Sequence, residues 1–396
     1  MKKTFLLSAI VIGMVLASCQ KDPAVSEASK DNNTSNLSQR HGPETAPTIT
    51  VFASGFNNPR GLKFGPDHLL YVAEGGIGGS DISQGCDQVI PPVGPYTGSP
   101  TGSRISRVNC DGVRSTYVDN LPSSQTNASQ GSLVSGVGDI AFIGNTLYAV
   151  LAGAGCSHGV SSVPNGVIRV NSNKTWKLIA NLSDFQKANP VQNPEEDDFE
   201  PDGTWYSMIN VRDELYAVEP NHGEMVKVSF GERHDWDRWD RDRDRRRKPK
   251  ISRVIDISAS QGHIVPTAVA FNDGNFYVGN LNPFPIVDGS SSIYKITPWG
   301  HIQVWAEGFT TIVGVAFDRH ERMYVLENTT GNLFPTPGTG KIIRVNRSGE
   351  KETIVTGLNL PTAMTFGPDG NLYVSVWGFG PPPIGLGQIL KIDLHN

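Results

Sequence analysis

The chain has 396 residues, a formal net charge of −5 and 38% hydrophobic residues. This apolar share is enough for a packed core and excludes a mostly disordered chain, and the mildly acidic balance does not fit a nucleic-acid binder. Only the N-terminus is apolar enough to enter a bilayer, which excludes a polytopic membrane protein. The 43 glycines and 27 prolines exceed their usual share and favour short strands joined by many turns.

Residues 1–18 have the features of a bacterial lipoprotein signal peptide. Lys2 and Lys3 precede an apolar run over residues 5–16, and Leu16-Ala17-Ser18 leads directly to Cys19. An apolar run this short followed by small residues is typical of a cleaved export signal. We expect cleavage before Cys19 and acylation of that cysteine, which would anchor the protein to a membrane.

Residues 19–47 are predicted to be the acylated cysteine and a flexible tether, because residues 20–47 contain almost no apolar side chains. Gln20-Lys21-Asp22 resembles the signal that sends lipoproteins of Bacteroidota to the cell surface. The expected location is the outer membrane or the cell surface of a Gram-negative bacterium, with the periplasmic and extracellular faces both left open.

Six copies of one pattern follow residue 48. In each copy an apolar run ends in Phe or Ile, a turn follows, and a second run carries Tyr before Val or Ala. The tyrosines are Tyr71, Tyr148, Tyr216, Tyr277, Tyr324 and Tyr373. A third strand is predicted in every copy and a fourth in the first five. Repeats of this size, roughly 50–75 residues with four strands each, are typical of a β-propeller.

The sequence therefore predicts an all-β, six-bladed β-propeller over residues 48–396. The sixth copy lacks a fourth strand, and residues 48–54 are expected to supply it, so that an N-terminal strand closes the last blade. Closing the ring removes exposed sheet edges. A β-sandwich does not repeat one hairpin six times, and a β-solenoid has shorter repeats.

Two rings of residues are expected at the top of the channel, the face where each innermost strand begins. Those preceding the innermost strands include Arg60, Asp139, Thr267 and Thr362. Those following the second strands include Glu74, Glu219, Asn280 and Glu327. Oxygen ligands converging on one axis are what Ca²⁺ or another divalent cation prefers. The alternative is that these acids accept backbone N–H bonds and cap turns.

Two charged segments stand out. Residues 231–250 are an Asp/Arg-rich insertion between the third and fourth strands of the third blade, interpreted as a solvated hairpin extension, with adhesion to polyanions as the alternative. Residues 194–203 contain six acids and are interpreted as a solvated loop. The scattered histidines, among them His158 and His222, are expected to be surface or hydrogen-bonded structural residues.

Acylation of Cys19 would leave three cysteines and at most one intramolecular disulfide. Cys86 and Cys156 are predicted in top loops of neighbouring blades, whereas Cys110 falls in a bottom turn. The topology favours a Cys86–Cys156 bond with Cys110 free.

Several strings resemble the ScyD/ScyE family, named for scytonemin-cluster proteins. They include residues 55–62 (GFNNPRGL), 71–76 (YVAEGG), 179–185 (IANLSDF), 283–285 (PFP) and 377–380 (WGFG). The resemblance covers residues 48–396 and implies an exported six-bladed propeller of NHL-like and SMP-30-like architecture, without a settled reaction. Residues 203–206 (GTWY) and the Asp/Arg insertion depart from the pattern.

Two functions compete, and a quinone-dependent sugar dehydrogenase of similar architecture is a third option whose His/Arg site is not identified in this sequence. The first is a non-catalytic binding lipoprotein, expected to be a monomer, that presents a top-face pocket to a small molecule, glycan or protein. The second is a lactonase-like hydrolase similar to SMP-30 and gluconolactonase, in which Glu74, Glu219, Asn280 and Glu327 hold a divalent ion that activates water.

Overall fold

The computed structural model describes residues 46–194, 199–231, 248–379 and 385–395. All of them belong to one of the two compact units into which the chain divides, Arg40–Asn396. Cys19, the predicted signal peptide and most of the predicted tether lie outside the described residues, as does most of the insertion at residues 231–250. In the described part, no helix is long and apolar enough to cross a membrane.

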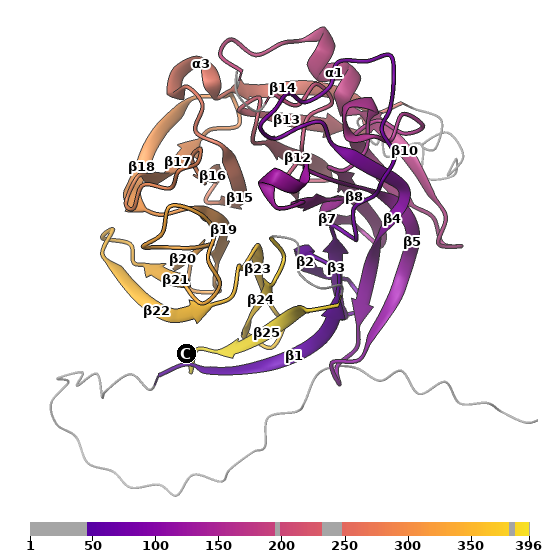
Figure 1. The fold of residues 1–396 in the computed structure, drawn as a ribbon. Helices are drawn as coiled ribbons and strands as arrows, with labels where there is room; N and C mark the ends of the chain where they lie inside the picture. Colours follow the sequence, from indigo (N-terminus) through magenta and orange to yellow (C-terminus); the bar gives the residue numbers. More distant parts are fainter. Residues whose placement is uncertain (1–45, 195–198, 232–247, 380–384, 396) are drawn as a thin grey trace, which may run out of the picture. The chain divides into compact units, whose positions relative to one another are not determined.

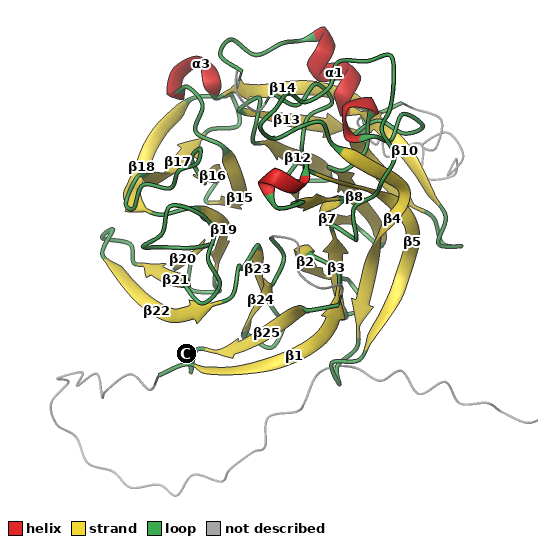
Figure 2. Ribbon diagram, in the orientation of Figure 1, coloured by secondary structure: helices red, strands yellow, loops and turns green. Residues whose placement is uncertain are grey.

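Six small sheets surround a central axis, which confirms the six-bladed β-propeller (Figures 1 and 2). Within each sheet, consecutive strands pair antiparallel as a meander. The first blade has five strands instead of the expected four, because the short strand β6 pairs with Ser124 and Gln125 of β5. The first three blades contain the following strands: β2 (Pro59–Phe64), β3 (Leu70–Glu74), β4 (Thr97–Val108), β5 (Arg114–Gln125) and β6 (Val134–Ser135); β7 (Val137–Ile143), β8 (Thr146–Leu151), β9 (Gly166–Val170) and β10 (Trp176–Asn181); β11 (Ser207–Val211), β12 (Glu214–Glu219), β13 (Glu224–Ser229) and β14 (Lys250–Asp256).

The last three blades have four strands each. They are β15 (Pro266–Asn272), β16 (Asn275–Asn280), β17 (Ser291–Ile296) and β18 (Ile302–Phe309); β19 (Ile312–Phe317), β20 (Met323–Glu327), β21 (Gly340–Val345) and β22 (Lys351–Leu358); β23 (Ala363–Phe366), β24 (Leu372–Val376), β25 (Gly387–Asp393) and β1 (Thr48–Phe56). Short helices lie in the loops: η1 (Ala128–Gln130), η2 (Cys156–His158), α1 (Leu182–Ala188) and α3 (Ser258–Gln261).

The predicted closure by the N-terminal strand is confirmed. Strand β1 pairs antiparallel with β25, from Thr48 opposite Asp393 to Phe56 opposite Gly387. It therefore supplies the outermost strand of the sixth blade, and it runs two residues beyond the predicted end at Ser54. The insertion at residues 231–250 also has its predicted place, because β13 ends at Ser229 and β14 begins at Lys250.

The repeated aromatic residues explain why the pattern recurs. In four of the six blades, the repeated tyrosine packs edge-on against the phenylalanine in the innermost strand of the next blade. The ring centroids are 5.1 Å apart for Tyr71–Phe142 and for Tyr277–Phe317, and 5.2 Å apart for Tyr324–Phe366. Tyr373 and Phe64 continue the series across the closure at 5.0 Å. Edge-to-face pairs of this kind add stability beyond their buried area, so these four repeats each specify a contact with the next blade.

Candidate functional site

The first predicted ring ties neighbouring blades together. The Thr362 hydroxyl donates to the Pro59 carbonyl at 2.6 Å, which joins the sixth blade to the first. The Thr267 hydroxyl donates to the Ile312 carbonyl at 2.5 Å, which joins the fourth blade to the fifth. Both threonines are buried. Their polar atoms are therefore used within the protein, and they do not offer free groups to a ligand in the channel.

Asp139 plays the same structural part between the first three blades. Its two carboxylate oxygens accept the backbone N–H groups of Ile140 at 2.8 Å and Met208 at 2.9 Å, and Lys63 lies 3.7 Å away. Burial raises the pKa of Asp139 despite these partners. Gly61 of β2 packs directly against it, since a Cβ atom there would lie 1.8 Å from Asp139 Oδ1.

The second predicted ring caps the loop that leads into the innermost strand of the same blade. Glu74 accepts the N–H of Asn57 at 2.6 Å and pairs with the guanidinium of Arg104 at 2.8 Å. Glu327 accepts the N–H of Thr310 at 2.9 Å and pairs with Lys341 at 3.1 Å. Both carboxylates are fully buried. Arg104 and Lys341 are the register partners of these acids on the third strands.

Asn280 and Glu219 complete this ring with local partners of their own. Asn280 donates to the Ile264 carbonyl at 2.9 Å and accepts the Ser292 N–H at 2.7 Å. Glu219 accepts the N–H groups of Thr204 at 2.7 Å and His222 at 2.5 Å. Burial raises the pKa of Glu219 to about 7, an effect that the nearby His222 and the two N–H donors oppose. A carboxylate so perturbed is a common mark of a functional site, although structural networks produce it too.

These contacts favour the capping alternative for the second ring. Each of the four side chains is directed to a loop or strand of its own blade, and the structure does not bring them together around one point. In the residues that the structure describes, no group of three or more His, Cys, Asp or Glu side chains could hold a metal ion. The residues present therefore do not fit the predicted divalent-ion site.

Arg60 differs from the other ring residues. Its guanidinium lies 5.8 Å from the ring centroid of Tyr206 and 5.9 Å from that of Phe379, and it donates to the Val134 carbonyl. Arginine over aromatic faces within about 6 Å is a favourable cation–π arrangement. Among the described residues, no carboxylate lies within ion-pair distance of Arg60. We call Arg60, Tyr206, Trp377 and Phe379 the channel mouth.

Tyr206 crosses the top of the channel. It precedes β11 of the third blade, yet its hydroxyl donates to the carbonyl of Thr362 in the sixth blade at 3.2 Å. Tyr206, Leu281 and Trp377 pack against a core cluster that includes Val313 and Val376 of the fifth and sixth blades. All three are half-buried, so part of each side chain remains accessible to solvent.

Trp377 has an unusual backbone conformation. Its φ of 57° lies in the left-handed region, which is rare for a bulky residue. Its N–H donates to Asn359 O at 2.8 Å. The following residue, Gly378, touches the first blade, where a Cβ would meet the Pro59 carbonyl oxygen at 2.0 Å. Local strain of this kind concentrates at functional sites, which supports the channel mouth as the candidate site.

A buried polar cluster was missed in the sequence. Glu200 accepts the Tyr96 hydroxyl at 2.6 Å and lies 3.3 Å from His158 Nε2, while His158 Nδ1 lies 2.9 Å from the Ser124 hydroxyl. His222 contacts the Glu200 carbonyl at 3.0 Å. The interpretation of residues 194–203 as a solvated loop is therefore wrong at Glu200, because a distant segment supplies its partners. Residues 195–198 lie outside the described residues.

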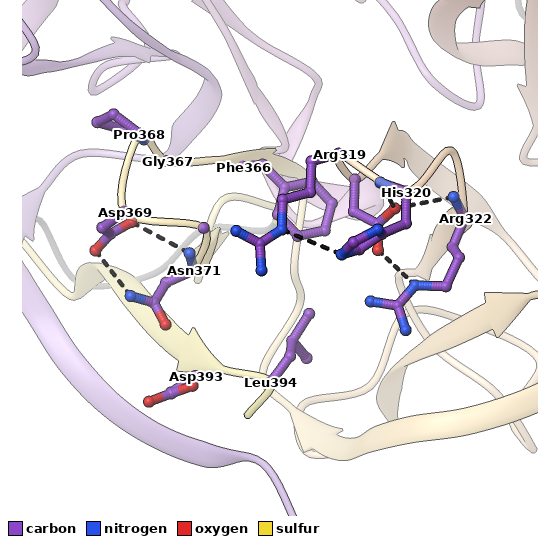
Figure 3. A pocket seen from close by; sticks show the side chains of 12 residues that line it. Arg319, His320, Arg322, Phe366, Gly367, Pro368, Asp369, Asn371, Asp393 and Leu394 are labelled. Atoms are coloured by element: carbon purple, nitrogen blue, oxygen red, sulfur yellow. Dashed lines mark hydrogen bonds and ion pairs between the residues drawn. The ribbon is translucent and has the colours of Figure 1, made fainter. Parts of the chain in front are cut away.

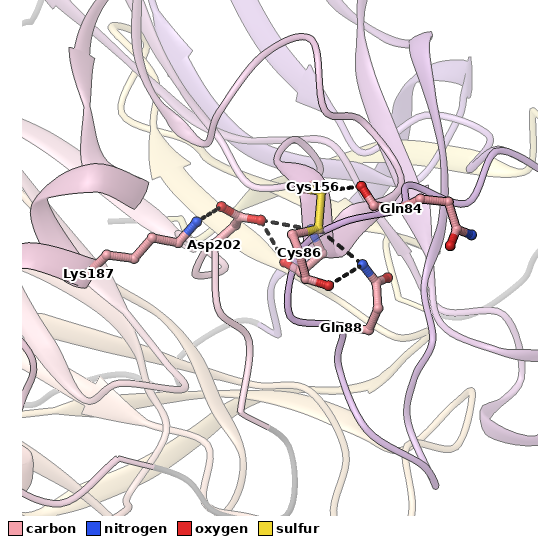
Figure 4. Close-up of a disulfide and its surroundings, with 7 residues drawn as sticks. Gln84, Cys86, Gln88, Cys156, Lys187 and Asp202 are labelled. Carbon is pink, nitrogen blue, oxygen red and sulfur yellow. Dashed lines mark hydrogen bonds and ion pairs between the residues drawn. A yellow bond between two sulfur atoms is a disulfide. The ribbon is translucent and has the colours of Figure 1, made fainter.

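The predicted disulfide is confirmed, and Figure 4 shows it beside Asp202 and Lys187. Cys86 and Cys156 are bonded, with their Cα atoms 6.3 Å apart. Ser157, the next residue, donates its N–H and its hydroxyl to Asp202 at 2.8 Å, and Lys187 pairs with Asp202 at 2.6 Å. Burial opposes ionisation of Asp202, but these donors together lower its pKa. No described cysteine is free, so the expectation of a free thiol at Cys110 is wrong.

The opposite face carries a cavity of about 330 Å³ between the fifth and sixth blades (Figure 3). It lies among the turns that hold Asp318, Arg319, Asp369 and Asn371. Most of its charged groups are already paired: Asp318 with Arg322 at 2.6 Å, and Asp369 with Lys391 at 2.7 Å. Arg319 also lines this cavity; it donates to His320 at 3.2 Å and has no carboxylate partner among the described residues, but no aromatic ring is found stacked on its guanidinium there, as two are on that of Arg60.

No protein-family model matches the chain, and no curated protein matches it in sequence. Solved structures do resemble it in fold. A protein of Thermus thermophilus assigned as an oxidoreductase (glucose dehydrogenase) is 16% identical, with a TM-score of 0.53 over 88% of this chain and 100% of that one. The PQQ-bound aldose sugar dehydrogenase of Streptomyces coelicolor is 13% identical, with a TM-score of 0.50 over 89% and 99%.

A gluconolactonase of Xanthomonas campestris is 10% identical, with a TM-score of 0.49 over 88% of this chain and 89% of that one. At such low identity these similarities concern the fold. The two dehydrogenase structures, with TM-scores of 0.53 and 0.50, support the propeller architecture that the ScyD/ScyE resemblance implies, and they do not confirm membership of that particular family.

Proposed function

We propose that this protein is a ligand-binding β-propeller that captures a small anionic molecule at the channel mouth. The observation that carries the proposal is the position of Arg60 between the rings of Tyr206 and Phe379, without a carboxylate partner among the described residues. A guanidinium in such a setting offers several N–H donors to a carboxylate or phosphate. The aromatic rings add flat apolar surface for the rest of the ligand.

The proposal extends to the cellular setting. Export by the signal at residues 1–18 and acylation of Cys19 would place this binding module in the outer membrane or at the cell surface of a Gram-negative bacterium. The remaining expectations are a monomer and a small molecule, a glycan or a protein at the top face. Of these ligands, a small anion best matches a single guanidinium that has no carboxylate partner in the described part of the chain.

The lactonase-like hydrolase is supported less well. The propeller fold of this protein is compatible with a hydrolase, since solved propellers of similar architecture include enzymes that act on sugars. The four predicted ligands, however, are each hydrogen-bonded within their own blade. We therefore assign no catalytic role to Glu74, Glu219, Asn280 or Glu327.

The test is a calorimetric screen of the purified full-length chain against small carboxylates, sugar acids, phosphate esters and neutral sugars. Arg60→Met is compared with Arg347→Met, an exposed arginine that pairs with Glu321 on the protein surface. Loss of a charge-assisted hydrogen bond is expected to weaken anion binding by about 10- to 100-fold in Arg60→Met alone. Equal affinities for both variants, or binding of neutral sugars only, would contradict the proposal.

A further inference from the structure

Two top-face loops present an exposed apolar ridge. Residues 281–290 join β16 to β17, and residues 328–339 join β20 to β21. Phe284, Val287, Leu333 and Phe334 on these loops are 41%, 64%, 64% and 60% exposed. We call these four side chains the apolar ridge. Large apolar side chains gathered on a surface commonly mark a place of interaction.

Hydrogen bonds and an aromatic contact hold the two ridge loops together. Ile286 donates its N–H to the Leu333 carbonyl at 2.8 Å, and Asp288 accepts the Gly331 N–H at 2.9 Å. The rings of Phe284 and Phe334 lie 6.1 Å apart, a usual separation for an aromatic pair. The apolar side chains therefore stay exposed on a framework held by hydrogen bonds across two blades.

One of the two ridge loops begins beside the core cluster that the channel mouth also contacts. Leu281 begins the loop that carries Phe284, and it packs with Tyr206 and Trp377 against one core cluster. Three residues of extended chain span at most about 10 Å, so Phe284 lies within that distance of Leu281, which packs against the same core cluster as Tyr206 and Trp377. Both features also share the top face, because each follows or precedes the same ends of the strands.

We infer that the ligand is amphipathic: a soluble carboxylate or phosphate monoester whose acidic group pairs with Arg60 and whose apolar chain or ring lies along the ridge. This inference rests on the proposed function and specifies its ligand class. Charge complementarity supports it, since the cation is at the mouth and neither ridge loop contains Lys or Arg. An anionic bilayer would instead favour basic residues around the apolar side chains.

The test uses the purified full-length chain with laurate, methyl laurate and butyrate as probes. Four proteins are compared: wild type, Arg60→Met, Phe284→Ser/Phe334→Ser, and Trp299→Ser as a matched control. Trp299 is 90% exposed in the turn between β17 and β18, on the opposite face. Laurate is expected to bind at least about 10-fold more tightly than butyrate or methyl laurate. The double variant and Arg60→Met should each lose about 10-fold or more, and Trp299→Ser should bind like wild type.

The outcomes separate the two proposals. Arg60-dependent binding in which butyrate equals laurate and the double variant equals wild type would overturn the amphipathic ligand and leave the anion site standing. Absence of any Arg60-dependent anion binding would overturn both. Sedimentation with phosphatidylglycerol vesicles that depends on Phe284 and Phe334 but not on Arg60 would overturn the inference in favour of a bilayer. A cooperative thermal unfolding transition establishes that each variant is folded. Small changes in midpoint are expected for the exposed Phe284, Phe334 and Trp299.

Discussion

Tyr206 in the third blade donates its phenolic hydrogen to the carbonyl of Thr362 in the sixth blade, 3.2 Å away across the channel. Blades that are not neighbours in the ring are thereby joined at the axis. Burial raises the pKa of Tyr206, which keeps the hydroxyl protonated and able to donate. Within the channel mouth, Tyr206 therefore spans the axis, and the Arg60 guanidinium lies against the Tyr206 ring.

Replacing Tyr206 with Phe removes this bond across the axis and keeps the ring. The Thr362 carbonyl then loses a donor, and the free energy of unfolding should fall by about 0.5–1.5 kcal/mol. Urea unfolding measures the change. Tyr117→Phe is the control, because no hydrogen bond of the Tyr117 hydroxyl is found among the described residues. An unchanged Tyr206→Phe midpoint would show that the bond contributes little to stability.

Glu219 should make stability depend on pH. Its pKa of about 7 in the folded protein exceeds the ordinary value of 4.5, so the folded chain keeps a proton that the unfolded chain has released. The free energy of unfolding should therefore fall as pH rises from about 4.5 to about 7, by about 3 kcal/mol for this group. Glu219→Gln should flatten that slope, whereas the exposed Glu307→Gln should leave it unchanged. Parallel slopes for wild type and Glu219→Gln would refute the assignment.

Gly61 and Asp139 should be energetically coupled. A Cβ at Gly61 would overlap the Asp139 carboxylate, so Gly61→Ala is expected to cost about 2 kcal/mol or more, as overpacking in a core does. In a double-mutant cycle with Asp139→Ala, the combined loss should be smaller than the sum of the single losses. Strict additivity would mean that the overlap is relieved elsewhere.

The Cys86–Cys156 bond should stabilise the loop that carries Tyr206. Opening a bond that closes 70 residues is expected to cost about 2–4 kcal/mol. Because Ser157 beside Cys156 holds Asp202, the Cys86→Ser/Cys156→Ser variant should also exchange amide hydrogens faster over residues 199–206. Hydrogen-exchange mass spectrometry measures this, with β19 as an internal reference. Exchange that rises equally in both regions would indicate global loosening only.

Removal of metal ions should leave the thermal unfolding midpoint unchanged if the carboxylates of Glu74 and Glu327 cap loops by accepting backbone N–H groups and do not bind a metal. Treatment with EDTA is expected to shift the thermal midpoint by less than the scatter between repeats. Glu74→Gln, by contrast, should lower stability by about 1–3 kcal/mol, since Arg104 and the Asn57 N–H lose a charged acceptor. A midpoint that drops on chelation in wild type, and not in Glu74→Gln, would restore the metal hypothesis.

The fold was predictable because its determinants are local and repeated. Phe142 and Tyr71 recur as a pair in other blades, and each pair specifies one contact between neighbouring sheets. The closure by residues 48–54 followed from the missing strand of the sixth copy. The Cys86–Cys156 bond followed from topology as well, since both loops leave the same face.

The site was predictable only in part. Residue type and position were enough to select the ring residues, but whether Glu74 faces the axis or its own blade depends on Asn57 in the preceding loop and on Arg104 in the adjacent strand β4. Glu200 is similar, because its partners Tyr96 and His158 come from two other blades. Tyr206 had a visible signal: it lies in the segment 203–206 that departs from the ScyD/ScyE pattern.

The pairing of Thr48 with Asp393 has a consequence for orientation. Strand β1 starts at the bottom of the disc and ends at the top, where the chain turns into β2. The described chain therefore enters the propeller on the face opposite the channel mouth and the apolar ridge.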